Sequence, residues 1–349
     1  MEQKNGKFWE SNGDFLKTVW MAGNGSGKAR EKMLVWKETT GHLEEGDGSF
    51  GGFTVPQQFR DNVMAVALEK SVVLSRAIVI DMVSKTVKIP SFVDEDHATS
   101  IFGGITVTWP GEAGALTIKN PTFQSINLQA KKAVGYVKIS NELMEDASQA
   151  ESVITRAFGE AIAYFADIEY ISGNGSNRPL GILNAPCTIP VAIESQQAAA
   201  TVIFENMIKM DSRLLPQSQR SAVWLINPDV KASLFKANLP VSSGGSIAFN
   251  LAGGPDGLWA LGHEIIPTEK CETLGNVGDI YLADFGNYVV GNGGLQIDVS
   301  GEVDFVTDES TWRFGLRTDG QPILSSAITK LNGTDTVSPF ITLATRDGT

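Results

Sequence analysis

Apolar residues recur at every third or fourth position over residues 149–172, which is the pattern of a helix with one buried face. Ser148 and Glu151 fit a capping box at the start of this segment, and Gly173 follows it where a left-handed C-cap is common. We therefore predict one helix of about 35 Å, at 1.5 Å per residue. The predicted buried stripe consists of Ile154, Ala157, Phe158, Ala161, Ile162, Phe165, Ile168 and Ile171.

Strand-like patterns dominate the chain before this helix. Residues 71–83 and 85–92 are rich in β-branched residues and each predict a strand. From about Asp94 to Val137 helix formers are few, and apolar and polar residues alternate near both ends, within 105–109 and 126–130. We predict one long hairpin there. An isolated two-stranded hairpin is marginal in water, so another part of the chain or of an assembly must support it.

The chain after the helix shows both periods, which predicts a mixed α/β region over residues 174–297. Beyond it, Trp312, Phe314 and Leu316 alternate with charged residues or glycine and predict a further strand. Within the mixed region we predict helices near 201–215 and 228–238, and strands near 222–228, 258–262, 263–268, 279–285 and 288–291.

Residues 1–52 show no sustained helical or strand period, although they contain several aromatic residues. A disordered tail seldom carries three tryptophans, and this segment has Trp9, Trp20 and Trp36. We interpret the segment as an extended arm whose aromatic side chains fill pockets on another surface, such as a neighbouring copy. Trp20 and Trp36 are therefore candidate subunit-interface residues.

Composition and charge exclude several classes of protein. The 349 residues are 42% hydrophobic and 19% charged, as in an ordinary globular protein, and the net charge is −12. A negative chain disfavours tight wrapping of nucleic acid, because a phosphate backbone attracts clustered cations. Cys187 and Cys271 are too few and too far apart for a disulfide framework, which favours folding in a reducing cytoplasm. The sequence has no signal peptide and no apolar run near the roughly 20 residues of a membrane span, so we expect a soluble protein.

Two glycine-rich segments could hold a phosphate, but neither has the required context. Residues 172–183 follow a predicted helix, whereas a phosphate loop precedes a helix so that the N–H groups point at the ligand. In residues 23–29 the two glycines are one residue too close for a P-loop, and Ala29 stands where a hydroxyl residue would bind Mg²⁺. We interpret both segments as turns and predict no cofactor site.

The sequence also lacks a suitable set of residues for metal binding or nucleophilic catalysis. The three histidines, His42, His97 and His263, are far apart in sequence, and no G-x-S-x-G motif occurs. The acidic run at 94–97 is better explained as a solvated turn, and Cys187 as a packed thiol. We predict no catalytic and no metal-binding residue.

Two features suggest an interface instead. The stretch 109–116 places Trp109, Pro110 and Glu112 in an otherwise polar hairpin, and an exposed tryptophan is a favoured interface anchor. Packing of Trp109 against its own domain is the alternative. Arg313 and Arg317 share one strand face and could pair with carboxylates across an interface, although a solvated face is equally compatible.

In the order of its motifs, the chain resembles the major capsid proteins of tailed bacteriophages, the Hong Kong 97 type of shell protein. The motifs are GGFTVP at 51–56, WPGEAGAL at 109–116, VKISNELMEDA at 137–147, YISGNGSNRPLGILN at 170–184, WLINPDV at 224–230 and GHEIIPT at 262–268.

The resemblance implies an α+β fold of the Hong Kong 97 type, with no enzymatic activity and no cofactor. The implied long helix is the family's spine helix, and the implied hairpin is its extended loop. By this resemblance the regions are an N-terminal arm (1–52), a first peripheral part (53–93), the extended hairpin loop (94–137), the spine helix (138–173), an axial domain (174–297) and a second peripheral part with the C-terminus (298–349).

The same resemblance implies a virion protein that is assembled in the host cytoplasm. Copies would form hexamers and pentamers of an icosahedral shell, with the extended loop over the adjacent subunit. The shell would enclose double-stranded DNA without sequence-specific binding and would not contact a membrane. Portal and scaffolding proteins are the implied partners, with decoration proteins as further candidates.

Two family features are not matched. Only about 50 residues without heptads precede Gly52, so we expect a separate scaffolding protein rather than a self-scaffolding segment. Some members join subunits through a Lys–Asn bond promoted by a glutamate. The hairpin offers Lys119, Lys131 and Lys132, but the partner residues cannot be matched, so no cross-link is predicted.

Two alternatives stay open. An encapsulin-like compartment shares the fold but carries enzyme cargo, and its genomic neighbours would differ from those of a phage head protein. A β-rich hydrolase with an inserted α/β domain would be a monomer or dimer with a deep polar pocket. The capsid interpretation depends on the arm and the hairpin leaving surface uncovered that only other copies can shield.

Overall fold

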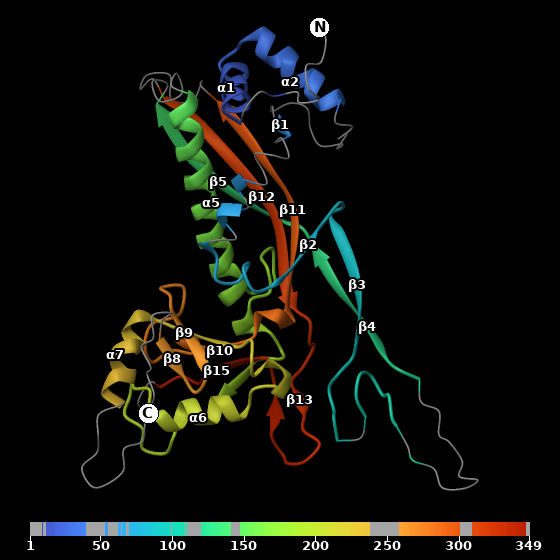
Figure 1. Ribbon diagram of the computed structural model, residues 1–349, viewed down its shortest axis with the longest axis vertical. Coiled ribbons are helices and arrows are strands. Elements are labelled where there is room, and N and C mark those ends of the chain that lie inside the picture. The colour runs from blue at the N-terminus through green and yellow to red at the C-terminus, as the bar shows by residue number, and fades with distance from the viewer. Residues whose placement is uncertain are drawn as a thin grey trace.

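The molecule is elongated. One sheet and a long helix fill the upper part of Figure 1, a second sheet lies below them, and a hairpin descends along one side. The computed structural model describes residues 9, 12–39, 53–54, 62–63, 65–67, 70–98, 100–107, 109, 120–140, 147–237, 258–300 and 309–346.

The upper sheet is centred on two long antiparallel strands. In β12, Trp312 and Leu316 are buried against the helices, so the alternating Arg313 and Arg317 lie on the opposite face. The sheet order is β1 (Phe53–Thr54), β11 (Tyr288–Ser300), β12 (Glu309–Pro322) and β5 (Lys131–Ser140), and β2 (Ile78–Asp81) pairs in parallel with the start of β11.

The long helix α5 (Ala147–Ser172) covers the inner face of this sheet, which confirms the predicted helix. Its buried side is shifted relative to the predicted stripe, because Ala157 and Phe165 are exposed whereas Ala163 and Asp167 are buried. An α-helix has 3.6 residues per turn, so a row of positions four residues apart turns gradually around the helix axis. The positions buried in this series are Ile154, Phe158, Ile162, Ala166 and Tyr170.

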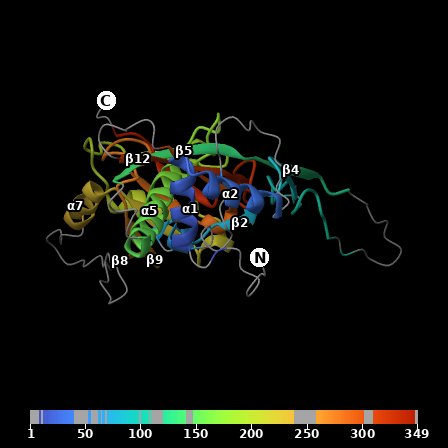
Figure 2. The same cartoon turned by 90° about the horizontal axis from the view of Figure 1, so that it is seen from above.

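Residues 12–39 form two helices, α1 (Asn12–Gly23) and α2 (Gly27–Thr39), so the prediction of an extended arm is wrong for this segment. Trp9, Phe15 and Val19 are buried in the same core as α5 and the inner face of the upper sheet. Seen from above, α1 and α5 lie on one side of β5 and β12 (Figure 2). The helical period was missed because each helix is only about three turns long and the turn between them interrupts it.

The lower sheet has six strands and mixed directions. Alternate residues of each central strand are buried on opposite faces, so Trp224 and Ile226 pack towards α6 (Phe204–Ser212) and α7 (Pro228–Ala237). Val223 and Leu225 pack towards the end of α5. The order is β6 (Ile189–Val191), β15 (Phe340–Leu343), β10 (Ile280–Ala283), β7 (Val223–Ile226), β9 (His263–Pro267) and β8 (Leu258–Ala260).

Short elements connect these layers. Within the described residues, three single-turn helices lie between longer elements of the chain, and a small hairpin stands below the upper sheet (Figure 1). They are η1 (Ile182–Asn184), η2 (Pro216–Ser218), η3 (Phe285–Asn287), β13 (Ile328–Thr329) and β14 (Thr336–Val337). None of the helices among the described residues is both long and apolar enough to cross a membrane.

The projecting hairpin pairs β3 (Thr86–Phe92) with β4 (Phe123–Gln129), from Thr86 opposite Gln129 to Phe92 opposite Phe123. The predicted outgoing arm at 105–109 is therefore wrong. It contributes one bridge, between Ile101 and Ile105, and the true partner of β4 is the run that was predicted as an independent strand. Residues 131–137, which the prediction placed at the end of the hairpin, lie in the upper sheet as part of β5.

Sheet membership also differs from the predicted boundary at 297. Strand β11 starts at Tyr288 and belongs to the upper sheet, whereas β15, close to the C-terminus, lies between β6 and β10 of the lower sheet. Strand pairing is non-local, so a single-sequence pattern does not say which sheet a strand joins. Residues 141–146, between β5 and α5, lie outside the described residues.

Candidate functional site

The projecting hairpin exposes large apolar side chains. Trp109 is 94% exposed, and Val107 and Phe123 are also exposed. Phe92 stacks at 4.9 Å between ring centroids on Phe123, and both rings remain partly in solvent. Apolar patches of this kind on a soluble protein mark sites of interaction.

The base of the hairpin is held by its own chain. Ile126 and Leu128 of β4 are buried together with Met82 and Val289, so the hairpin is supported where it leaves the upper sheet. The hairpin therefore has the support that an isolated two-stranded hairpin needs to be stable in water.

A second attachment lies lower down, where the hairpin meets β13 and the segment before it. The backbone N–H of Thr329 donates to the carbonyl of Glu95 at 2.9 Å, and the N–H of His97 donates to the carbonyl of Thr329 at 3.0 Å. Gln124 donates to the carbonyl of Ile323 at 3.1 Å. The hairpin is therefore tied at its base and again at residues 95–97.

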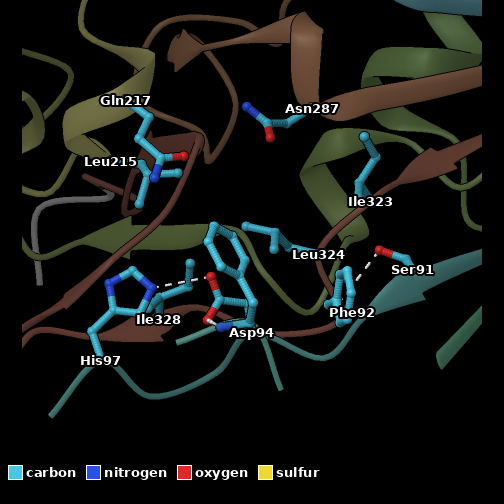
Figure 3. Close-up of a pocket in the computed structure, with 11 residues that line it drawn as sticks. Ser91, Phe92, Asp94, His97, Leu215, Gln217, Asn287, Ile323, Leu324 and Ile328 are labelled. Carbon is cyan, nitrogen blue, oxygen red and sulfur yellow. Dashed lines mark hydrogen bonds and ion pairs between the residues drawn. The ribbon is translucent and has the colours of Figure 1, made fainter. Parts of the chain in front are cut away.

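Between these attachments a pocket of about 210 Å³ remains open (Figure 3). Its hairpin side includes Asp94 and His97, which face each other at 3.0 Å between carboxylate and ring nitrogen. The opposite wall comes from the lower part of the molecule. The lining residues are Ser91, Phe92, Asp94, His97, Phe102, Leu215, Gln217, Asn287, Ile323, Leu324 and Ile328. A mixed apolar lining with one carboxylate–imidazole pair offers no placed nucleophile.

The loop at 172–183 is clamped by a lysine that sequence reasoning did not single out for this role. The ammonium of Lys131 donates to the carbonyls of Gly175 at 3.1 Å and Arg178 at 2.6 Å. It also pairs with Asp319 at 3.0 Å, and Asp319 accepts the N–H of Gln129 at 2.7 Å. The loop presents carbonyl oxygens to a cation, which is the reverse of a phosphate site. Only the tertiary structure reveals this role, because Lys131 and the loop are far apart in the sequence.

Of the predicted interface residues, Trp109 lies on the hairpin and is solvent-facing, while Pro110 and Glu112 fall outside the described residues. Arg313 is held by Asp298 within the same sheet. Burial is slight there, and the hydrogen bond to Asp298 raises the pKa of Arg313. Arg317 is half-buried opposite Lys132 of β5. The role of these residues at an interface stays a prediction.

The two predicted tryptophans of the N-terminal region lie on their own chain. The indole of Trp20 donates to Ser310 at 3.1 Å, and Trp36 packs at 5.8 Å edge-on against Trp9. Both are half-buried, so each keeps some surface towards solvent. The pockets that hold these two side chains are therefore formed mainly by residues of the same chain.

The two cysteines are buried in one core between α5 and the lower sheet. Burial raises the pKa of both thiols to about 12. At pH 8 the thiolate is then about one part in ten thousand, against about a quarter for an ordinary thiol. Among the described residues, no group of three or more histidine, cysteine or carboxylate side chains is placed to hold a metal ion.

We expect alkylation of Cys187 and Cys271 by iodoacetamide at pH 8 to be at least about 1,000-fold slower in the native protein than after unfolding in guanidinium. Mass spectrometry of the time course checks this. Rapid modification of either thiol in the native state would contradict the burial and the raised pKa.

Comparison with known proteins supplies the family. The model of the Phage capsid family matches residues 51–333, which is most of the chain. The chain belongs to the phage capsid family. The resemblance found in the sequence motifs is thereby confirmed. No curated protein sequence matches the chain.

Solved capsid structures share the fold of this family member. The capsid of a native GTA particle is 16% identical, with 87% of this chain and 95% of that chain covered and a TM-score of 0.56. For the capsid of an empty GTA particle the values are 15%, 88%, 97% and 0.58. For Mycobacterium phage Bobi they are 16%, 80%, 91% and 0.53.

These likenesses confirm the α+β fold of the Hong Kong 97 type. The phage capsid protein described here is a structural subunit of a multimeric shell and a component of the virion, not an enzyme.

Proposed function

We propose that this protein is the major head protein of a tailed bacteriophage with a double-stranded DNA genome. Its copies form hexamers and pentamers that close into an icosahedral shell around the DNA. The observation that carries the proposal is the hairpin, which projects from the body and exposes Trp109 almost completely. In a shell, the partner closest to this exposed surface is a second copy of the same chain.

The surface that needs a partner is smaller than the sequence suggested. The N-terminal helices cover their own core, so they do not by themselves require another copy. The hairpin is tied to the body at two places, yet its outer apolar residues remain in solvent. The need for association therefore rests on the hairpin.

We expect Trp109→Ala to raise the protein concentration at which shells or capsomers form by at least about tenfold, because a central interface tryptophan contributes about 2 kcal/mol or more and 1.4 kcal/mol is a factor of ten. The single chain should keep its melting temperature, since the side chain makes little contact within it. Light scattering and negative-stain microscopy over a concentration series measure the threshold.

Trp109→Phe is the matched variant and should assemble close to the unaltered protein, because it retains an aromatic anchor. Assembly of Trp109→Ala at the normal concentration would contradict a role for this residue. An unaltered protein that stays a monomer or dimer under all conditions would contradict the proposed function itself.

The finer partners belong to the same proposal. Portal and scaffolding proteins would nucleate and guide the shell in the host cytoplasm, and decoration proteins would bind its outside. The peripheral and axial regions named in the sequence analysis would act as the domains of the subunit. Particles isolated from producing cells should contain double-stranded DNA. Particles that contain a protein cargo and no genome would instead favour an encapsulin-like compartment.

A further inference from the structure

The lower attachment of the hairpin adds a short third strand to the small sheet of β13 and β14. Asp96 forms a parallel bridge with Thr329 of β13. The backbone N–H of Thr329 donates to the carbonyl of Glu95, and the carbonyl of Thr329 accepts the N–H of His97. Residues 93–98, which we call the strap, therefore bind the hairpin to β13 through backbone groups of a single residue of that strand.

Strand β13 in turn is fixed to the lower part of the molecule. Arg213, directly after α6, donates to the carbonyl of Thr336 in β14 at 2.7 Å. Leu215, Ile328 and Val337 form a small buried core between the same segments. The strap thus ties a hairpin that starts at the upper sheet to a rigid part of the body beside the lower sheet.

The strap is folded by contacts within itself. The carboxylate of Asp94 lies 3.0 Å from a ring nitrogen of His97 and accepts the backbone N–H of Phe102 at 3.2 Å. The carboxylate of Asp96 accepts the N–H of Ala98 at 2.8 Å. These bonds do not involve β13, so the strap keeps them when it leaves that strand.

The lower attachment is the weaker of the two. The upper one is a packed core around Leu128, whereas a pocket of about 210 Å³ stays open beside the strap (Figure 3). Phe92 and Phe102 line this pocket and are still 41% and 45% exposed, so they make fewer contacts than side chains of a close-packed core. Regions with few buried apolar contacts open locally before a packed core does.

The strap also turns part of an apolar surface towards its own body. Phe92 stacks on the exposed Phe123, and its ring centroid is 6.4 Å from that of Phe102. While the strap is bound, Phe92 and Phe102 face the pocket of their own chain, so another copy cannot fully cover them. Release of the strap would join both rings to the exposed patch of Phe123 and Ile101, and a larger patch of this kind favours association.

We propose that the strap is an autoinhibitory contact. In the free chain it holds the hairpin against its own body, and its release from β13 lets the hairpin engage an adjacent copy while the base stays attached. The inference rests on the proposed function, because it names the step that precedes association through the hairpin.

The full-length double variant Asp96→Cys, Thr329→Cys tests the proposal. Neighbouring strands lie about 4.8 Å apart, and a disulfide spans about 4.4–6.8 Å between Cα atoms, so the two cysteines can lock the strap to β13. We expect the oxidised form to need at least about tenfold more protein to assemble than the same chain reduced with dithiothreitol. Light scattering and negative-stain microscopy measure both thresholds, and non-reducing electrophoresis with mass spectrometry verifies the bond within one chain.

Asp96→Cys alone is the matched control and should assemble equally in both redox states, because the native Cys187 and Cys271 are buried. Equal thresholds for the oxidised and reduced double variant would overturn the inference and leave the proposed function standing. A lower threshold for the oxidised form would also overturn it, because the bound strap would then be the assembling position. Failure of the unaltered chain to assemble would contradict both.

Hydrogen exchange in the unassembled chain tests the order of release. The amide of Thr329, bonded to the strap, should exchange at least about tenfold faster than the amide of Gln129, which donates to Asp319 at the base of the hairpin. NMR resolves the two amides. Equal protection of both would show that the strap does not open before the base, and would contradict the inference.

Discussion

Asp167→Ala is expected to lower the free energy of unfolding by about 3–5 kcal/mol, the range for breaking a buried ion pair from one side. Asp167 on α5 is fully buried, and its carboxylate pairs with the ammonium of Lys270 at 2.7 Å. Lys270 is itself largely buried. Loss of the carboxylate would leave this ammonium without its counter-charge in a region that excludes water.

The same carboxylate joins three distant parts of the chain. It accepts the hydroxyl proton of Ser71 and the backbone N–H groups of Val72, at 2.8 Å, and Val73, at 3.3 Å. These groups belong to the turn that leads into β2, whereas Lys270 follows β9 of the lower sheet. Alanine would therefore strand several buried donors at once, each at a cost of about 1–3 kcal/mol if it stays unpaired.

Urea unfolding followed by circular dichroism measures this effect. Glu160→Ala is the matched control on the same helix, because Glu160 pairs with Arg156 four residues away at 2.9 Å in an exposed position. Exposed helix pairs of this kind contribute about 0.3–0.5 kcal/mol. If both variants unfold at the same urea concentration, the Asp167 contacts do not stabilise the junction of α5 with the lower sheet.

Arg346→Ala is expected to have a similar effect, again about 3–5 kcal/mol, at the other end of the chain. Arg346 and Asp279 form an ion pair in which both side chains are almost completely buried. The carboxylate of Asp279 also accepts the N–H of Gly275 at 3.0 Å, and the backbone N–H of Arg346 donates to the carbonyl of Gly275 at 2.7 Å. This cluster fixes the chain directly after β15 to the loop before β10.

The mechanism can be separated from a loss of packing. Arg346→Met combined with Asp279→Leu removes both charges while filling the space, and such replacements are often neutral or stabilising. The double variant should therefore recover most of the stability that Arg346→Ala loses. Arg178→Ala is the surface control, because Arg178 is exposed and pairs with Glu169 at 3.3 Å. A double variant as unstable as Arg346→Ala would show that the charge pair is not the cause.

Local pattern was a good guide where an element is long and one of its faces is buried. The helix α5 and the strand alternation of Trp312 with Arg313 could both be predicted, because a single periodicity repeats over many residues. The helices of residues 12–39 were not, since each is short and a glycine turn separates them. Their aromatic residues were assigned to a neighbour, although Trp9 and Phe15 fill their own core.

The candidate site was only partly readable for a related reason. Trp109 stands out in a polar stretch, so its exposure could be anticipated. Lys131, Asp319 and Thr329 have no distinctive neighbours in the sequence, and their roles arise from contacts between segments that are far apart along the chain.

The sequence by itself determined the long helix, the strand-forming runs, the acidic net charge and the ordered motifs of a capsid protein. These properties depend on residues close together or on simple sums, so they need no knowledge of the fold. The tertiary structure alone decided which strand pairs with which, where the hairpin is held, and which charges are buried. Those outcomes depend on contacts across long loops, whose pairing is selected by the packing of the whole molecule and not by any local pattern.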